Sequence, residues 1–243
     1  MPHRMINRRS RQGVSCWRFP RTLILGLGLV GCATTPQAHT TLPGPAWPDL
    51  PPRPALVEAP APTASPDYST LPNHVLKRTT WTQAKPRLTD IKPMVPIRFI
   101  TIHHDALPLP AVSSMAGVKA RLELIRRAHT KDRGWSDIGY HFAVDRAGRV
   151  WEARSLKYQG AHVKNHNEGN IGIVLLGNFE LSTPTAPQIN ALNRLVRGFR
   201  SIYRIPLQNV RCHQEWSGAV TACPGKSLAR YVTKARKNGK FGS

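Results

Sequence analysis

Cysteine is scarce in this chain of 243 residues, which has only Cys16, Cys32, Cys212 and Cys223. So few cysteines exclude the disulfide framework that holds small secreted domains together. Because Cys16 and Cys32 belong to an N-terminal segment of different composition, the rest of the chain can form at most one bridge, between Cys212 and Cys223. That bridge and a metal-binding role for Cys223 are therefore alternatives.

Acidic residues are scarce too: the chain has 13 Asp and Glu against 35 Lys and Arg, a formal net charge of +22. Six of the arginines lie in residues 1–31, so a chain that begins at Cys32 would carry 22 − 6 = +16. Such a surface attracts polyanions, which include nucleic acid, acidic lipid headgroups and an anionic cell wall. The basic residues are scattered and do not alternate with aromatic ones, which disfavours nucleic acid.

The sequence also lacks an apolar run long enough to span a bilayer, since the run at residues 22–31 has only ten members. A basic stretch followed by a short apolar run is typical of an export signal. The run ends in Leu29-Val30-Gly31-Cys32, which resembles a bacterial lipobox and implies cleavage before Cys32 and lipid attachment to its sulfur. The alternative is an ordinary signal peptide followed by a chance cysteine. With Ala33 after the cysteine, we expect an exported lipoprotein of the outer membrane that faces the periplasm, if the host is a diderm bacterium.

Proline divides the chain, because residues 33–75 hold 11 of the 22 prolines. This segment cannot bury a core and is expected to be an extended, semi-rigid tether. The predicted organisation is a lipoprotein signal peptide at 1–31, the lipidated Cys32 with its proline-rich disordered tether at 32–75, and one folded domain at 76–243.

Apolar periodicity in the folded domain predicts strands interspersed with helices. Short apolar runs predict strands at residues 97–102, 140–144, 150–152, 171–176 and 209–212, with a hairpin turn at 145–148. Helical spacing predicts a helix through Val118, Leu122 and Ile125, a long helix after Pro187, and a final helix at about 227–237. We therefore predict an α/β fold, a single domain with a central mixed β-sheet flanked by helices.

His103, His213 and Cys223 each stand where a metal ligand would fit. His103 follows the apolar run at 97–102, His213 follows a short predicted strand, and Cys223 lies in Thr221-Ala222-Cys223-Pro224-Gly225. Two imidazoles and one thiolate suit Zn²⁺ and leave a fourth position open for water, which is typical of hydrolytic sites. The sequence thus predicts a zinc hydrolase if the three side chains converge.

Several motifs occur in a fixed order around these residues. They are Thr101-Ile102-His103-His104, Gly134-Trp135-Ser136-Asp137-Ile138-Gly139-Tyr140-His141-Phe142, Asp145-Arg146-Ala147-Gly148-Arg149-Val150-Trp151-Glu152-Ala153-Arg154, Gly160-Ala161-His162, Ile171-Gly172-Ile173-Val174-Leu175-Leu176-Gly177-Asn178-Phe179, and Thr221-Ala222-Cys223-Pro224-Gly225. Over about residues 75–235 this series resembles the type 2 N-acetylmuramoyl-L-alanine amidases. It is most similar to the peptidoglycan recognition protein branch, which includes the phage lysozyme-type zinc amidases.

The resemblance implies a zinc amidase that cleaves the bond between N-acetylmuramic acid and L-alanine in peptidoglycan or its fragments. Its zinc ligands correspond to His103, His213 and Cys223, with Tyr140 and Thr221 as catalytic residues that stabilise the oxyanion. Substrate contacts are implied for His162, Asn167 and Trp135. Thr221 has an equal alternative as a loop residue that caps a turn.

Two features depart from the family pattern. The spacing from His213 to Cys223 is about two residues longer than usual, which predicts a bulged loop at residues 214–220. Some relatives place a glutamate base in the strand where this chain has Val174. The main alternative function is a non-catalytic recognition module that binds peptidoglycan, although such members commonly lack the cysteine ligand.

Overall fold

A computed structural model describes residues 74–107 and 114–242. The predicted signal peptide, the lipid attachment at Cys32 and nearly all of the predicted tether lie outside these residues and stay predictions. In the described ranges, no helix is long and apolar enough to cross a membrane.

Six strands form one mixed sheet in the order β1-β4-β3-β5-β2-β6. Their bounds are β1 Val75–Leu76, β2 Phe99–His104, β3 Phe142–Val144, β4 Val150–Glu152, β5 Asn170–Leu175 and β6 Val210–Cys212. Only β3 and β4 pair antiparallel, through the predicted hairpin turn, and the other neighbours are parallel. The predicted mixed sheet is confirmed. The two-residue strand β1 was not predicted, because so short a segment carries no periodic pattern.

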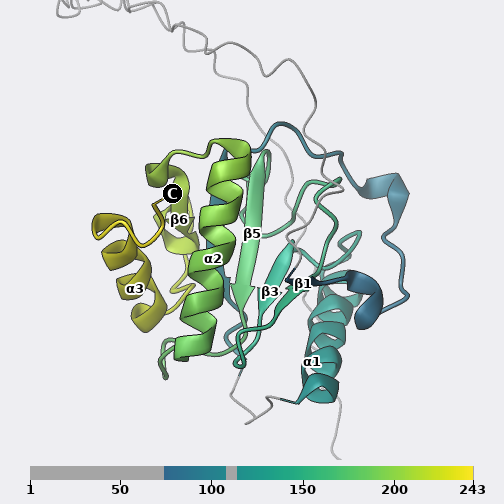
Figure 1. Cartoon of the computed structure of the whole chain (residues 1–243). Helices are drawn as coiled ribbons and strands as arrows, with labels where there is room; N and C mark the ends of the chain where they lie inside the picture. Colours follow the sequence, from purple (N-terminus) through teal and green to yellow (C-terminus); the bar gives the residue numbers. More distant parts are fainter. Residues whose placement is uncertain (1–73, 108–113, 243) are drawn as a thin grey trace, which may run out of the picture. The chain divides into compact units, whose positions relative to one another are not determined.

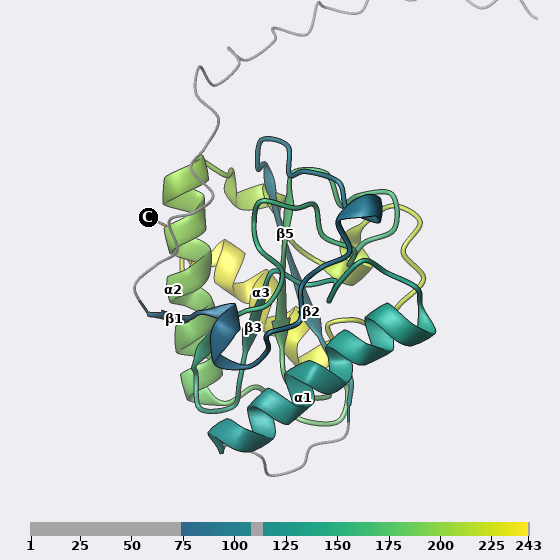
Figure 2. The same cartoon turned by 90° about the vertical axis from the view of Figure 1, so that its right-hand side faces the viewer.

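Helices cover both faces of the sheet (Figures 1 and 2). Helix α1 (Met115–Arg127) covers one face and continues into a π-helical turn at Ala128–Asp132. Helices α2 (Ala186–Tyr203) and α3 (Lys226–Lys237) cover the other. Helix α2 begins one residue before Pro187 rather than after it, because Thr185 and Gln188 form a capping box and proline is tolerated in the first turn.

Alternation along strand β2, which lies between β5 and β6, separates two apolar clusters, one on each side of the sheet. Ile100 and Ile102 pack with the apolar sides of α2 and α3 in the larger cluster. On the α1 side, Val174 and Ala143 pack with Val118 and Leu122, and Tyr140 lies against this cluster. The next residue that β2 turns toward the α1 side, after Thr101, is His103.

Short 3-10 turns connect these elements, at Arg78–Thr80, Leu88–Asp90, Leu207–Asn209 and His213–Glu215. The last of these turns follows β6 directly and therefore lies beside the end of β2, with which β6 pairs. This arrangement brings His213 to the end of the strand that carries His103.

Candidate functional site

The three predicted metal ligands converge at the end of β2. Their candidate donor atoms all lie within 4.8 Å of one another. His103 Nδ1 is 3.6 Å from the Sγ atom of Cys223, and the rings of His103 and His213 have centroids 4.7 Å apart. Ligands at the usual Zn–N and Zn–S distances from a tetrahedral ion lie about 3.5 Å apart. The donor set and its spacing therefore fit a zinc ion.

Both cysteines of the folded domain are free thiols, so the alternative of a bridge between Cys212 and Cys223 is wrong. Their places in the fold explain the difference between them. Cys212 is the last residue of β6 and packs into the core beside α2 and α3, whereas Cys223 lies in the loop before α3 and points at His103. Burial strongly raises the pKa of the Cys212 thiol, which acts as a small apolar side chain.

A chain of hydrogen bonds fixes which nitrogen of His103 faces the cluster. His162 Nε2 lies 3.1 Å from the carbonyl oxygen of Asn170, which can only accept, so Nε2 carries the proton. His162 Nδ1 is then an acceptor, and it lies 3.1 Å from His103 Nε2, which must donate. The unprotonated nitrogen of His103 is therefore Nδ1, which faces Cys223. This relay from Asn170 through His162 leaves Nδ1 of His103 free to bind a metal ion.

Burial keeps the imidazoles of this relay neutral. It lowers the pKa of His103 well below its ordinary value, and the neighbouring His162 and His213 lower it further. The pKa of His162 is lowered for the same first reason, with His141 as the next cause. Burial raises the pKa of the Cys223 thiol to about 12, so this thiol keeps its proton unless a cation replaces it. A bound cation would be held by a neutral nitrogen of His103 and the thiolate of Cys223, and no ion pair would have to break for it to bind.

His162 is held in place by glycines whose missing side chains make room for its ring. A Cβ atom on Gly172 of β5 would lie 2.6 Å from the ring Cδ2 atom, and one on Gly160 would lie 2.5 Å from it. His141 buttresses the same region: its Nδ1 accepts from the amide of Gly172, and its Nε2 donates to the carbonyl of Tyr158. The motif glycines at these positions are therefore steric requirements of the relay.

Tyr140 lies beside the metal-ligand cluster, with its ring centroid 5.1 Å from that of His103. Burial, with the nearby Cys223 thiol and Asp105 as further causes, raises the pKa of its hydroxyl. The phenol therefore keeps its proton at neutral pH and is a hydrogen-bond donor rather than a base.

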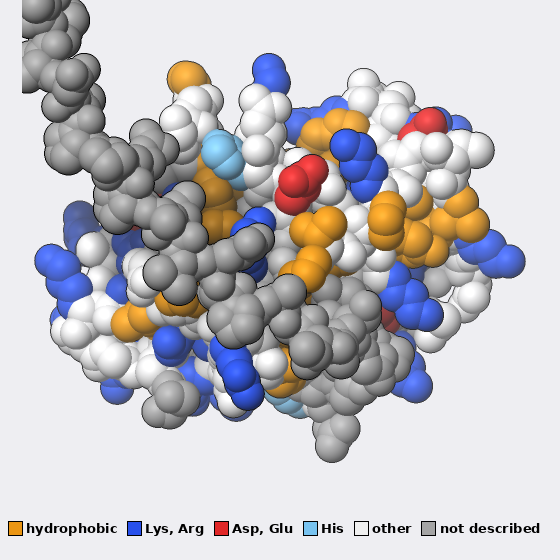
Figure 3. Space-filling model, turned by 90° about the horizontal axis from the view of Figure 1, so that it is seen from above, with side chains coloured by type: hydrophobic (Ala, Val, Ile, Leu, Met, Phe, Trp, Pro, Cys, Tyr) orange, Lys and Arg blue, Asp and Glu red, His pale blue; other side chains and the backbone are white. Residues whose placement is uncertain are grey.

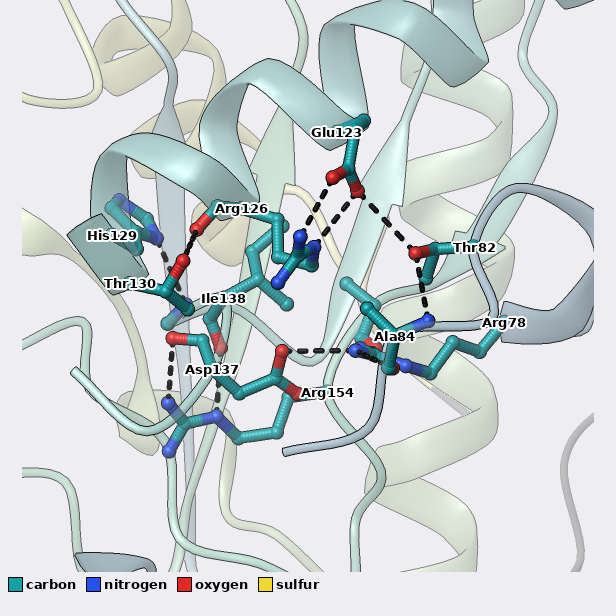
Figure 4. A network of polar contacts seen from close by, with 12 residues as sticks. Arg78, Thr82, Ala84, Glu123, Arg126, His129, Thr130, Asp137, Ile138 and Arg154 are labelled. Atoms are coloured by element: carbon teal, nitrogen blue, oxygen red, sulfur yellow. Dashed lines mark hydrogen bonds and ion pairs between the residues drawn. The ribbon is translucent and has the colours of Figure 1, made fainter. Parts of the chain in front are cut away.

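A buried polar network positions the segment that precedes Tyr140 (Figure 4). Arg78 donates to the Asp137 carboxylate at 2.9 Å, and Arg154 donates to the carbonyl oxygens of Asp137 and Ile138. His129, at the end of the α1 layer, accepts from the amide of Gly139 through Nδ1 at 3.0 Å. The backbone on the N-terminal side of Tyr140 is thus fixed from two sides.

Thr221 is exposed, and its hydroxyl oxygen accepts from the Cys223 amide at 3.0 Å. This bond caps the turn, the alternative role that the sequence offered for Thr221. Because the hydroxyl oxygen only accepts in this bond, its proton stays available to a ligand. The predicted bulge at 214–220 is closed by a bond from the Gln214 amide to the carbonyl of Cys223 and is anchored by buried Trp216, whose indole donates to Thr101. Val220, at the far end of the bulge, is fully exposed.

Trp135 and Asn167, which are predicted with His162 to contact substrate, line two grooves beside the cluster of His103, His213 and Cys223. One groove, of about 480 Å³, is lined by Trp135, His162, Asn167 and His213 together with the exposed cations Arg133 and Lys164. A second groove of about 320 Å³ shares Trp135 and Asn167 with it. Asn167 also holds the loop, because its Oδ1 accepts from the amides of His162 and Val163. Arg133 stacks over the Trp135 ring at 5.1 Å.

No carboxylate base is supplied by the strand next to His103. Val174, where some relatives have glutamate, is fully buried and pairs with His103 in the sheet register. The acid closest in sequence, Asp105, accepts from Arg121 and from the amide of Gly177. Its carboxylate is therefore committed to holding α1 and the loop after β5.

Sequence reasoning missed the supporting residues, which are His129, His141, Asn170, Arg78, Asp137 and Arg154. Asp137, His141 and Arg154 stand inside the motifs that carried the resemblance, and the other three stand outside them. No signal in a single sequence marked them as partners of the site, because each acts through a contact with a residue far away along the chain.

The fold and the site define a class of protein: an α/β domain with a cluster of two histidines and one cysteine beside a groove. The family model described as N-acetylmuramoyl-L-alanine amidase matches residues 93–226. The chain therefore belongs to the N-acetylmuramoyl-L-alanine amidase family.

Individual relatives support this family assignment. The N-acetylmuramoyl-L-alanine amidase of Sus scrofa is 34% identical over 102 residues, which are 42% of this chain and 17% of that protein. The chain thus spans about a sixth of the length of this curated amidase. Peptidoglycan-recognition protein SC2 of Drosophila melanogaster is 33% identical over 132 residues, 54% of this chain and 70% of that protein. A mutant of Drosophila PGRP-LB in complex with tracheal cytotoxin superposes with a TM-score of 0.60 at 25% identity, covering 66% of this chain and 93% of that one.

Proposed function

We propose that this protein is a zinc-dependent amidase that hydrolyses the amide bond between N-acetylmuramic acid and L-alanine in peptidoglycan or its fragments. The observation that carries the proposal is the complete cluster of His103, His213 and Cys223, with donor atoms within 4.8 Å of one another. A module that only binds peptidoglycan has no use for three converging ligands.

His103, His213 and Cys223 would hold the zinc ion. Bound there, zinc would polarise the scissile carbonyl and lower the pKa of a water molecule toward neutrality. The nitrogen that His103 offers is set by the relay through His162, and the thiol of Cys223 must lose its proton to bind.

Tyr140 and Thr221 would supply hydrogen bonds to the oxyanion that develops on the scissile carbonyl. The raised pKa of Tyr140 keeps its hydroxyl a donor, and the Thr221 hydroxyl retains its proton because its oxygen accepts from the Cys223 amide. Neither residue has to be deprotonated for this role. The strand beside His103 offers no carboxylate, so we assign to the attacking water itself the proton that the leaving amine takes up. A bound zinc ion would lower the pKa of that water.

The groove next to the cluster would bind the stem peptide. Arg133 and Lys164 give it two exposed cations, which suit the carboxylates of such peptides, and Trp135 and Asn167 line it between them. His162 would contact substrate only through its carbon edge, because the protein engages both of its nitrogens. We expect attachment to a membrane through Cys32 to hold this domain near its polymeric substrate.

Digestion of defined muropeptides, with the products weighed by mass spectrometry and zinc measured on the same samples, tests the proposal. The full chain is expected to contain about one zinc ion and to release free stem peptide. Cys223→Ser is expected to lose both. Cys212→Ser is the matched control, because it changes a buried cysteine that does not face the cluster, and it should keep both.

Two results would reject the proposal. Full activity of Cys223→Ser would show that the thiol is dispensable. A zinc-loaded full chain that binds muropeptides without releasing stem peptide would instead identify the recognition module.

A further inference from the structure

The helix layer formed by α2 and α3 is strongly basic and contains no acidic residue. Residues 186–243 include eleven Lys and Arg and only one acid, Glu215, which gives 11 − 1 = +10 of the chain's net charge of +22. Glu215 lies between the two helices in sequence and is bonded to Arg236. The charge of the folded domain is therefore concentrated in its C-terminal part.

Exposed basic side chains of the two helices form one outward surface, which we call the basic face. Along α3 they recur every three or four residues, the spacing that places side chains on one side of a helix. The two helices lie side by side, joined by a hydrogen bond from the Tyr231 hydroxyl to Asn193 at 2.8 Å. The basic face comprises Arg194, Arg197 and Arg204 at α2 and Lys226, Arg230, Lys234 and Lys237 at α3, all exposed.

Most of these charges are uncommitted. Within residues 74–107 and 114–242, the side chains of Arg194, Arg230, Lys234 and Lys237 make no hydrogen bond or ion pair. Lys226 faces Glu180 in an exposed pair at 3.7 Å. In the view of Figure 3, too, exposed basic side chains are spread over the described surface and acidic ones are few. Within the described residues, Glu180 is the only acid that pairs with the basic face.

The basic face and the ring of His103 lie on opposite sides of the sheet. Ile100 and Ile102 of β2 point toward α2 and α3, whereas His103, one residue further, points to the α1 side with Tyr140. A flat anionic surface that binds the basic face therefore leaves the groove open on the other side. If the basic face bound the wall polymer instead, it would turn the groove away from its substrate.

The start of the folded domain lies next to the basic face. His74 is close enough to Arg194 that the charge of the guanidinium contributes, after burial, to lowering its pKa. His74 is also 74 − 32 = 42 residues after Cys32, at the end of the predicted tether. A chain anchored through Cys32 would thus enter the domain on the side that carries the basic charges.

We propose that the basic face of α2 and α3 binds the anionic headgroups of a phospholipid membrane and so orients the groove away from the lipid. The contact is electrostatic and needs no insertion, since the exposed stripe of α3 is cationic rather than apolar. It adds to the anchor predicted at Cys32 and does not require the amidase activity.

Vesicle binding of the full chain tests this proposal. The face variant is Arg194→Gln, Arg230→Gln, Lys234→Gln and Lys237→Gln together. The control variant removes four charges from the α1 side instead: Lys85→Gln, Lys119→Gln, Arg127→Gln and Lys131→Gln. Both keep the same N-terminal segment and the same net charge. Each is measured by co-sedimentation with phosphatidylcholine vesicles, with and without phosphatidylglycerol.

A cationic side chain near an anionic bilayer strengthens binding by about fivefold. Allowing for incomplete contact by a rigid surface, the face variant is expected to bind phosphatidylglycerol vesicles at least about 30-fold more weakly than the unchanged chain. The control variant should lose much less, and neither should change on pure phosphatidylcholine. Both should cleave a soluble muropeptide at the unchanged rate, which separates this test from that of the proposed function.

Equal losses in the two variants would overturn the proposal, because net charge alone would then explain binding. Unchanged binding of the face variant would overturn it as well. If that variant lost affinity for double-stranded DNA but not for the vesicles, the basic face would be a nucleic-acid surface.

Discussion

Replacing His162 by alanine is expected to weaken zinc binding without removing any ligand. The substitution deletes the acceptor that His103 Nε2 uses at 3.1 Å. His103 is then free to carry its proton on Nδ1, the nitrogen that faces Cys223, and its ring can rotate into the space left behind. Zinc must then select one tautomer and one ring orientation from several.

The expected loss is about 10- to 100-fold in zinc affinity, the usual effect of removing a hydrogen bond to a ligating histidine. This corresponds to about 1.4 to 2.7 kcal/mol. The Asn170 carbonyl that loses its partner lowers the stability of the variant with and without zinc, and so does not add to the loss of affinity.

Zinc affinity is measured by competition with a chromophoric chelator, and the visible spectrum of the cobalt form reports ligand geometry. His162→Asn is the matched variant, since its side-chain oxygen can accept from His103 where Nδ1 did, and it should recover most of the affinity. Thermal unfolding of the metal-free proteins checks that both variants fold. Unchanged affinity in His162→Ala would refute the relay, and equal losses in the alanine and asparagine variants would reduce His162 to a packing role.

Gly172→Ala is expected to weaken zinc binding as His162→Ala does, because the new methyl group would overlap the His162 ring. Gly198→Ala on α2 meets no atom within 4 Å, so it should leave zinc affinity unchanged and raise stability by up to about 1 kcal/mol. Equal zinc affinities of the two glycine variants would contradict this. Burial lowers the pKa of His129 to about 4, below its ordinary 6.5. As the pH drops from 6.5 to 4, the unfolded chain therefore takes up a proton that the folded chain does not, and the free energy of unfolding falls. This group contributes at most about 3 kcal/mol to that fall. His129→Asn should therefore flatten the dependence of the unfolding free energy on pH over that range, measured by denaturant titration, and an unchanged slope would rule His129 out as its source. Activity on carboxylate-bearing wall fragments should fall as salt is added, because Arg133 and Lys164 are exposed and screened, and rates indifferent to ionic strength would argue against their role.

The strands and helices could be predicted because their signals are local. Short apolar runs became β2, β4, β5 and β6, and the apolar spacing of Leu192, Val196 and Phe199 became the buried side of α2. The strand β3 was predicted two residues too early. The backbone of Tyr140 and His141 still bonds to Arg154, Ala153 and Gly172, but the antiparallel ladder with β4 ends at Glu152. The first two-residue strand left no pattern to find.

The predicted ligands could be named because each stands in a motif at the end of a strand or in the loop before a helix. Their convergence is a tertiary fact: β2 and β6 pair in parallel, which places the turn of His213 beside the end of β2. The sequence left Thr221 open between a capping and a catalytic role, and the structure shows the cap while leaving the hydroxyl proton available.

By itself, the sequence determined the fold class, the candidate metal ligands and the excess of positive charge, since these follow from residue identity and periodicity. Only the tertiary structure decided that both thiols are free, that Nδ1 of His103 faces the cluster, and that the basic helices lie across the sheet from the ring of His103. Hydrogen-bond partners such as Asn170 and His162 depend on distances between residues that sequence spacing does not contain. The physical reason is that a tautomer or a free thiol is settled by neighbours in space, whereas a strand or helix is largely settled by neighbours along the chain.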